Sequence, residues 1–225
     1  MNPLHIKALK SSVFGAFILG AMVFLPAGTW NYWQGWAYIA TFVVATTLIT
    51  VSLAKSSPAL LERRMKAGPT AEKDPAQKLI MTYASLGFIA GIVVPALDRR
   101  FGWSAAPSYA SIIGDICILI GFYIVYRVMS QNQFAASTIQ VETKQTVTTT
   151  GMYAVVRHPM YAGALPILLC TPLALGSWWG MLVFPLAFPA LALRLLNEEK
   201  FLQKNLEGYA EYMKKVKYRL IPFIW

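Results

Sequence analysis

The chain has 225 residues, of which 56% are hydrophobic and only 13% are charged, and its mean hydropathy is +0.50. A soluble domain carries roughly 25% charged residues, so this composition excludes an ordinary soluble fold. The apolar residues suffice for several bilayer crossings. We therefore expect an all-α integral membrane protein with a single membrane domain over residues 1–225 and no separate soluble domain.

The formal net charge of +10 would suggest a nucleic-acid partner if the protein were soluble. Here, however, Lys and Arg lie between apolar runs, where they set topology and meet anionic headgroups. The two cysteines, Cys117 and Cys170, lie in different apolar runs and have neither disulfide nor metal-ligand spacing. We expect the bilayer as a partner, and neither nucleic acid nor a metal.

Four apolar runs precede residue 127, and each is long enough or nearly long enough for a transmembrane helix. They cover about residues 11–26, 36–54, 79–97 and 109–126. The first connection is uncharged and rich in tryptophan and tyrosine, which is typical of a membrane interface. The second connection, residues 55–78, is polar and positive, and this predicts a cytosolic loop.

Residues 127–150 are less apolar, and the alternation over 138–142 predicts an extended, ordered link. Two apolar runs follow, at 162–175 and 180–193, each about fourteen residues long and therefore short for a full crossing. They predict a tight helical hairpin. Helical spacing of apolar residues beyond 193 predicts that the second arm extends into an amphipathic cytosolic helix.

Of the 20 Lys and Arg residues, only Arg99 and Arg100 fall on one side of this topology, and the other 18 fall on the opposite side. The positive-inside rule then places both termini in the cytosol, with four spans and a hairpin between them. Both ends of the hairpin face the same side as the termini. Polar residues at these two ends can therefore meet in one site.

The polar residues at the two ends of the hairpin are Arg157 and His158 before it and Arg194, Glu198 and Glu199 after it. Each alone could simply extend to the membrane interface, and Arg194 could pair with Glu198 one helical turn away. Glu198 and Glu199 point about 100° apart around a helix. We expect one of them to face the pocket and the other to face water.

A larger set of residues occurs in fixed order over roughly the last ninety positions: Tyr153, Arg157, His158, Pro159, Tyr161, Gly163, Glu198, Glu199, Tyr209, Tyr212 and the Arg-Leu-Ile-Pro segment at 219–222. This set resembles the isoprenylcysteine carboxyl methyltransferase and phospholipid methyltransferase superfamily of integral-membrane enzymes. The first half of the chain resembles that family only in its apolar spans. We accordingly divide the domain into a transmembrane scaffold, 1–128, and a cofactor-binding methyltransferase region, 129–225.

The resemblance implies that S-adenosylmethionine binds to the motif residues, because carboxylates suit its ribose diol and cationic or N–H donors suit its carboxylate. The implied cofactor-binding residues are Tyr153, Arg157, His158, Pro159, Tyr161, Gly163, Glu198 and Glu199. Arg194 matches the family arginine that holds the carboxylate of the substrate in the isoprenylcysteine branch. It is thus the candidate catalytic residue.

The implied function is S-adenosylmethionine-dependent methylation of a membrane-embedded, lipid-like acceptor, such as a prenyl-cysteine carboxylate or another isoprenoid or phospholipid head group. In-line alignment supplies most of the catalysis of such a transfer, so no metal or nucleophilic side chain is required. Two alternatives stay open: a membrane sterol-reductase-like enzyme that uses NADPH, and a non-catalytic membrane transporter or scaffold. A transporter would place polar residues at mid-membrane, and the spans have few.

Overall fold

The computed structural model describes residues 3–143 and 145–225, and all regular structure in these residues is helical. The six long helices are α1 (Pro3–Ala27), α2 (Trp33–Ser56), α4 (Pro75–Phe101), α5 (Ser108–Gln131), α6 (Pro159–Ala174) and α7 (Val183–Asn205). The short elements are α3 (Pro58–Met65), α8 (Tyr209–Lys215) and the 3-10 turns η1 (Pro69–Ala71), η2 (Gly151–Ala154) and η3 (Trp179–Leu182). The all-helical prediction is confirmed.

Five helical segments are long and apolar enough to cross a membrane: α1, α2, α4, α5 and the stretch Trp179–Asn205. The protein is therefore a multi-pass membrane protein. The four predicted spans are all present, and each helix extends beyond its apolar run. The second arm of the predicted hairpin continues past the apolar residues to Asn205, in line with the extension predicted beyond residue 193, whereas α6 has 16 residues and remains short.

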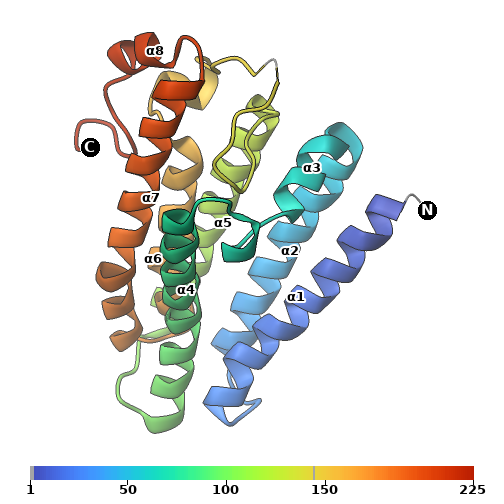
Figure 1. The fold of residues 1–225 in the computed structure, drawn as a ribbon. Helices are drawn as coiled ribbons and strands as arrows, with labels where there is room; N and C mark the ends of the chain where they lie inside the picture. Colours follow the sequence, from blue (N-terminus) through green and yellow to red (C-terminus); the bar gives the residue numbers. More distant parts are fainter. Residues whose placement is uncertain (1–2, 144) are drawn as a thin grey trace.

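The termini and the polar connections gather at one end of the bundle. Figure 1 shows the N- and C-termini, α3, the link from α5 to α6 and α8 toward this end, while the α1–α2 and α4–α5 connections turn at the other. We call these the site end and the far end. The arrangement follows from six long helices that alternate in direction.

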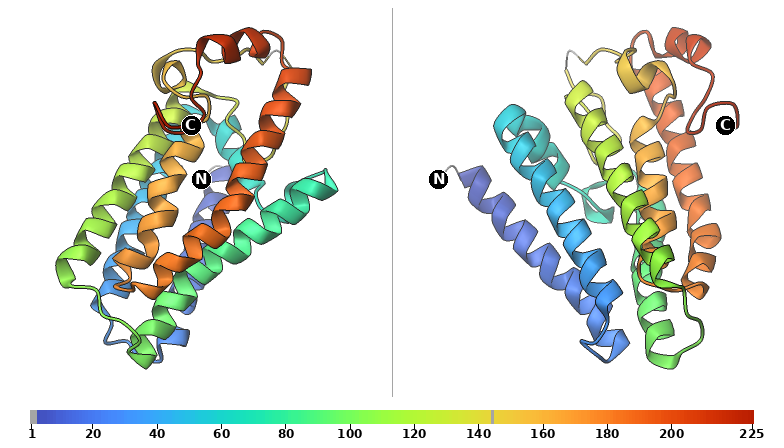
Figure 2. Two further views of the ribbon diagram at one scale, coloured as in Figure 1. Left: turned by 90° about the vertical axis from the view of Figure 1, so that its left-hand side faces the viewer. Right: turned by 180° about the vertical axis from the view of Figure 1, so that it is seen from behind.

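The helices are tied together at the far end and diverge toward the site end. The left view of Figure 2 shows α4 inclined to α5 and α6, and the right view shows α1 and α2 beside each other on one side of the bundle. At the far end, the Asp98 carboxylate of α4 accepts hydrogen bonds from the hydroxyls of Ser104 and Ser177, which precede α5 and α7. The Tyr32 hydroxyl before α2 also donates to the carbonyl of Leu175 after α6. These contacts join all the far-end connections.

The two arms of the predicted hairpin do not pack tightly on each other. Instead, α6 packs mainly on α5, and α7 packs mainly on α4. Glycines allow the close approach of α5 and α6: a Cβ on Gly121 would lie 2.7 Å from the carbonyl oxygen of Gly163. The prediction of a tight hairpin is wrong because each arm has a better-fitting neighbour, and the space between the arms contributes to the site.

The amphipathic extension of α7 is also interrupted. α7 ends at Asn205, and Gly208 takes a positive φ of 80° before α8 begins. This conformation suits glycine and reverses the chain direction. Apolar residues of the turn and of α8 then form a small separate core over the α5–α6 link, made of Leu206, Tyr209, Tyr212 and Val216 with Val141 and Val147.

The α5–α6 link has neither helix nor strand in its described residues, 132–143 and 145–150. Most of those residues are half-buried, which agrees with an irregular chain that packs under α8. The connection from α2 to α4 differs from the expected loop, since it contains α3 and η1. Both connections form the upper wall of the site.

Candidate functional site

A cavity of about 520 Å³ lies between the diverging helices, at the site end. This is within the range of about 300–1,000 Å³ that is usual for small-molecule sites. Apolar side chains line the deeper part: Phe42, Met81, Ala84, Phe122, Ile167 and Leu191. Charged and hydroxyl-bearing side chains line the part nearest the link and α8. The cavity is therefore amphipathic along its length.

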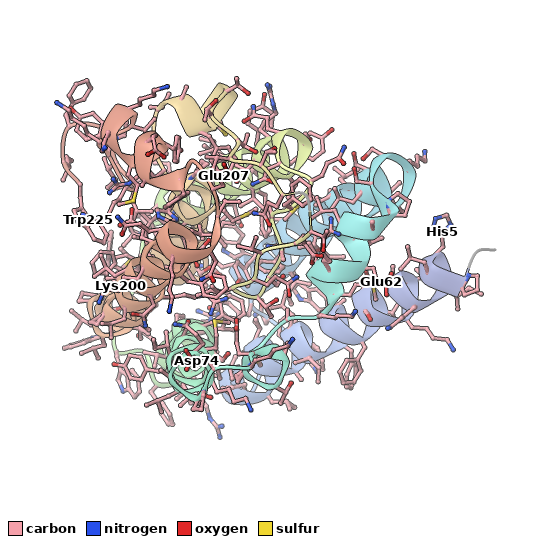
Figure 3. All side chains as sticks on the ribbon, turned by 45° about the horizontal axis from the view of Figure 1, so that its top comes forward. His5, Glu62, Asp74, Lys200, Glu207 and Trp225 are labelled. Carbon is pink, nitrogen blue, oxygen red and sulfur yellow. The ribbon has the colours of Figure 1, made fainter. Side chains whose placement is uncertain are left out.

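Charged side chains surround the rim of the site end on several segments. Figure 3 turns this end forward and shows Glu62 on α3, Asp74 before α4, Lys200 on α7 and Glu207 after α7. Asp74 caps α4, since its side chain accepts a hydrogen bond of 2.8 Å from the backbone N–H of Ala76. The site thus lies below a solvated, charged rim.

Glu199 is buried inside a cluster of basic groups. Its Oε1 lies 2.8 Å from Nε of Arg157 and 3.2 Å from Nε2 of His158, while Nε of Arg219 donates to Oε2 at 2.8 Å. Glu199 is only 4% exposed. The two polar ends of the hairpin do meet, as predicted. However, the expectation that the second glutamate faces water is wrong, because the C-terminal segment covers it.

The backbone around the start of α6 is fixed by that same C-terminal segment. The N–H groups of Arg157 and His158 donate to the carbonyls of Tyr218 and Arg219, both at 2.9 Å. His158 precedes the helix, and Pro159 is its first residue, a position that needs no backbone N–H. The Arg-His-Pro sequence thus turns the chain into α6 with both basic side chains held at Glu199.

Glu198 has different surroundings although it is the next residue along α7. It lines the cavity, and its Oε2 accepts a hydrogen bond of 2.6 Å from the Tyr161 hydroxyl. It has no basic partner within ion-pair distance among the described residues. Of the two glutamates, Glu198 is therefore the one available to a ligand.

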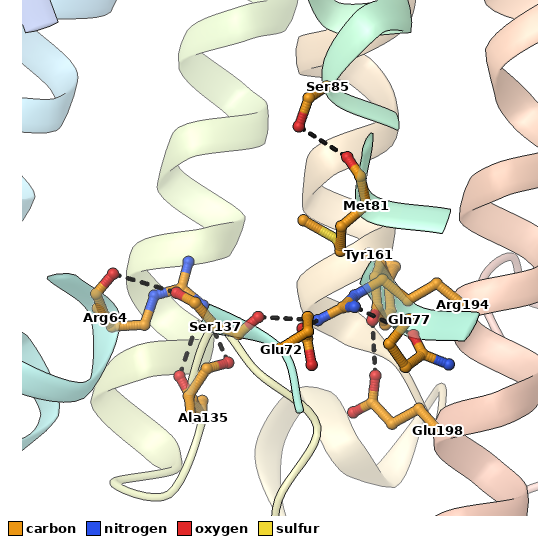
Figure 4. A network of polar contacts seen from close by, with 11 residues as sticks. Arg64, Glu72, Gln77, Met81, Ser85, Ala135, Ser137, Tyr161, Arg194 and Glu198 are labelled. Atoms are coloured by element: carbon orange, nitrogen blue, oxygen red, sulfur yellow. Dashed lines mark hydrogen bonds and ion pairs between the residues drawn. The ribbon is translucent and has the colours of Figure 1, made fainter. Parts of the chain in front are cut away.

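Arg194 lines the cavity one turn before Glu198 but does not pair with it. Its Nη2 donates to Oε1 of Glu72 at 2.7 Å and to the carbonyl of Ser137 at 2.8 Å, and its Nη1 donates to Gln77 at 3.2 Å. Figure 4 shows this network. The simple helix pair with Glu198 is not formed. Arg194 is instead neutralised by a carboxylate from the α2–α4 connection.

Three tyrosines of the motif lie at the mouth of the cavity. Burial raises the pKa of Tyr153 to about 12, and burial also raises the pKa of Tyr209 and of Tyr212. All three therefore stay protonated at neutral pH and can donate hydrogen bonds. Tyr212 donates to the carbonyl of Tyr153 at 2.7 Å, whereas the buried hydroxyl of Tyr209 has no hydrogen-bond partner among the described residues.

Most of the predicted site residues border the cavity, and two do not. Those that line it are Tyr153, Arg157, His158, Pro159, Tyr161, Arg194 and Glu198. Glu199 lies behind Arg157 and His158. Gly163 faces α5, where a Cβ would lie 2.8 Å from the side chain of Ile124. Gly163 therefore allows α5 to pack closely against the backbone of α6.

Several residues of the site were not predicted. Glu72, Gln77 and Arg64 come from the first half of the chain, so residues 1–128 contribute to the walls as well as to the scaffold. No motif marks them. Arg219 and Tyr209 belong to the recognised pattern, and their inclusion in it was the available signal. No group of three or more His, Cys, Asp or Glu in the described part of the chain could hold a metal ion.

Comparison with known proteins agrees with the motif. The family model of PEMT, phospholipid methyltransferase, matches residues 109–208, which include α5, α6, α7 and the link between α5 and α6. The delta(14)-sterol reductase TM7SF2 of Mus musculus is 33% identical over 126 residues, which is 49% of this chain. The match spans only 30% of the length of that reductase.

The family match covers the cavity walls built by α5–α7 and all the predicted residues from Tyr153 to Glu199. It bears out the predicted resemblance and indicates a membrane methyltransferase. The model that residues 109–208 match is that of the phospholipid methyltransferases, which belong to one integral-membrane superfamily with the isoprenylcysteine carboxyl methyltransferases.

Proposed function

We propose that the protein is an S-adenosylmethionine-dependent methyltransferase that acts on a membrane-embedded, lipid-like acceptor. The observation that carries this proposal is the pairing of charges around the cavity. Glu199 neutralises Arg157, and Glu72 neutralises Arg194. The groups of the described cavity wall that are left without an ionic partner are few and of both signs: Glu198 and Arg64. Such a wall suits a ligand that itself carries both charges.

The cavity offers polar groups of the kind that this cofactor needs. Glu198 uses one oxygen for Tyr161 and keeps the other for a ribose hydroxyl. The buried Tyr209 hydroxyl lacks a partner, and a buried hydroxyl without one is costly unless a ligand provides it. Tyr153, Arg157, His158 and Pro159 would form the adjoining wall. Glu199 and Gly163 would act indirectly, Glu199 by fixing the basic residues and Gly163 by seating α6.

The deeper, apolar part of the cavity would receive the acceptor. A second apolar cavity of about 60 Å³ between α4, α6 and α7 shares Ala84 and Leu191 with it, so apolar space continues into the bundle. An acceptor with an apolar tail and a polar head would match this gradient. Arg194, held rigidly by Glu72 and Ser137, would orient the head.

When bound, the cofactor would supply an activated methyl group. The residues of this chain would bind and align the two reactants and exclude water, and alignment is the largest contribution that such a reaction requires. A planar guanidinium orients a carboxylate or phosphate better than an ammonium group does. We therefore expect Arg194→Lys to keep cofactor affinity and to lose turnover.

We further propose that the site end faces the cytosol and that both termini lie there. The support is the distribution of charge: 18 of the 20 Lys and Arg residues belong to the site-end side. Reporter fusions at the C-terminus and near the turn at Trp178 test this orientation. A C-terminal reporter on the non-cytosolic side would contradict it.

The second candidate is an NADPH-dependent sterol reductase, favoured by the 33% identity to the mouse reductase. NADPH carries three phosphate groups, and phosphates are normally held by several cationic or N–H donors. The described cavity wall has one basic side chain without a carboxylate partner, Arg64. That shortage of uncommitted cations favours the methyltransferase.

Calorimetry on the purified protein tests both candidates with three ligands: S-adenosylmethionine, its demethylated product and NADPH. We expect the first two to bind and NADPH not to bind. Glu198→Gln should weaken binding about tenfold to a hundredfold, the cost of one charge-assisted hydrogen bond. Glu207→Gln, an exposed glutamate after α7, is the matched control. NADPH binding without S-adenosylmethionine binding would support the reductase instead.

Transfer of a radiolabelled methyl group into extracted host lipids then tests the reaction itself. The labelled product identifies the acceptor. A protein that binds S-adenosylmethionine but labels no lipid would contradict the lipid-like acceptor.

A further inference from the structure

Three arginines line the cavity, and they differ in their partners. Arg157 and Arg194 each have a buried carboxylate within 2.8 Å. Arg64, near the end of α3, has none within ion-pair distance in the described residues. Among the described residues, its side-chain hydrogen bonds join only Nη1 to the carbonyls of Ala135 at 3.5 Å and Ala136 at 3.3 Å. These are long for such bonds.

The remaining donors of Arg64 have no acceptor in the part of the chain that the structure describes. Neither Nε nor Nη2 makes a hydrogen bond to any described residue, and neither is among the fully buried atoms without a partner. These N–H groups are therefore open to whatever occupies the cavity. Burial also lowers the pKa of the Arg64 guanidinium, so its charge is poorly solvated where it lies.

Arg64 and Arg194 are connected through one residue of the link. The Ser137 hydroxyl donates to the carbonyl of Arg64 at 3.2 Å, and the Ser137 carbonyl accepts from Arg194 at 2.8 Å. Figure 4 shows Ser137 between the two arginines. The two guanidiniums interact electrostatically, yet Glu72 bonds to Arg194 alone. This wall of the cavity thus carries one positive charge that no carboxylate of the described residues balances.

A partly buried cation without a counter-charge is costly, and proteins normally pair such groups. The cost is offset if a bound ligand brings the anion. The guanidinium fork suits the oxygen pairs of carboxylates and phosphates. Glu198 is the corresponding uncompensated anion among the cavity-lining residues.

We propose that Arg64 anchors an anionic group, a carboxylate or a phosphate, of a ligand in this cavity. The residue lies in the first half of the chain, outside the segment 109–208 that matches the family model. This proposal rests on the proposed function, because that function supplies the two ligands from which the anionic group could come. One is the methionine carboxylate of S-adenosylmethionine, and the other is the head group of the acceptor.

The competing interpretation is that Arg64 only holds the α5–α6 link through Ala135 and Ala136. A purely structural arginine would affect stability and would bind ligands with and without the anionic group alike. An anion-binding arginine discriminates between ligands that differ only in the anionic group. Matched pairs of ligands therefore separate the two roles.

The test uses Arg64→Gln, Arg64→Lys and the control Arg63→Gln on the purified full chain in neutral detergent. Arg63 precedes Arg64 on α3, bonds to the carbonyl of Gln133 and does not line the cavity. Calorimetry compares S-adenosylmethionine with its decarboxylated form. Thermal stabilisation compares dodecyl phosphate with dodecanol as acceptor-like probes.

We expect Arg64→Gln to weaken the binding of one ligand that carries the anionic group about tenfold to a hundredfold, and to leave the binding of its counterpart without that group unchanged. Loss in the S-adenosylmethionine pair identifies the cofactor carboxylate, and loss in the dodecyl phosphate pair identifies the acceptor. Arg64→Lys should lose less affinity for that ligand, and Arg63→Gln should keep the affinity of the wild type. Unchanged discrimination in both pairs would overturn the proposal.

Two further results keep the test decisive. If Arg64→Gln does not fold, the wild type decides: equal affinity for both members of each pair overturns the proposal. If the wild type fails to bind S-adenosylmethionine at all, the proposed function fails, while the dodecyl phosphate pair still tests Arg64.

Discussion

The two ends of the bundle both contain buried carboxylates, and the comparison between them separates architecture from function. At the far end, Asp98 is 1% exposed and accepts hydrogen bonds from two serine hydroxyls and from the backbone of Ser104. All of these partners are neutral groups. At the site end, Glu199 and Glu72 are buried with arginines, whereas the nearby Glu198 and Arg64 have no ionic partner among the residues that the structure describes.

The difference indicates what each network is for. A polar network whose members are all satisfied rigidifies a fold. A network beside a cavity whose donors and acceptors are not all paired can form hydrogen bonds to a ligand. The far end therefore acts as a clamp that holds the helices together, and their divergence from it opens the cavity.

The largest expected effect is that of Glu199→Ala. The change leaves Arg157 buried without a counter-charge, and breaking such a pair costs about 3–5 kcal/mol of the free energy of unfolding. Glu198→Ala should cost less, about 1–3 kcal/mol, because it takes the acceptor from the Tyr161 hydroxyl but leaves no buried charge unpaired. Thermal denaturation in detergent measures both. Equal destabilisation by the two variants would remove the distinction between the neighbouring glutamates.

Asp98→Ala should destabilise the protein by about 1–3 kcal/mol, because the buried Ser177 hydroxyl and the Ser104 donors lose their shared acceptor. Ligand affinity should be unchanged in the protein that remains folded. Calorimetry at a temperature well below the midpoint of denaturation checks this. A large loss of affinity would show that the far end does more than clamp the helices.

Gly121→Ala should cost about 1–3 kcal/mol, because a Cβ there would lie 2.7 Å from the Gly163 carbonyl and the close α5–α6 contact would have to open. Gly15→Ala on α1 is the control, since no atom outside its own helix lies within 4 Å of a Cβ at that position. Denaturation midpoints of the two variants measure the difference. Similar midpoints would mean that the α5–α6 contact is not tight.

The smallest effect concerns Gly91, which borders the second apolar cavity on α4. A Cβ at Gly91 meets open space, so Gly91→Ala should stabilise the helix by about 0.5–1 kcal/mol. Gly87→Ala, four residues earlier, should instead destabilise, since its Cβ would lie 2.7 Å from Cβ of Ala187. The pair is compared by thermal denaturation, and opposite signs are expected.

The prediction of spans succeeded because it needed only local information. A run of about twenty apolar residues has few stable alternatives to a membrane helix. The meeting of Arg157 and His158 with the α7 glutamates followed from the same count, because both ends of the hairpin had to lie on one side. The predictions were wrong where packing between elements decides the structure. α6 packs on α5 and not on α7, and the chain turns at Gly208, so that α7 does not continue into α8.

Sequence by itself determined the solvent, the helices and the residues that gather at the site end, because hydropathy, charge position and an ordered motif are properties of the chain read locally. Only the tertiary structure shows that Glu199 is enclosed while Glu198 faces the cavity. It alone also shows that Arg64 has no carboxylate partner among the described residues. These outcomes depend on contacts across long separations: Glu72 pairs with Arg194 from 122 residues away. No periodicity encodes such a pair, because its energy exists only once both groups are removed from water together.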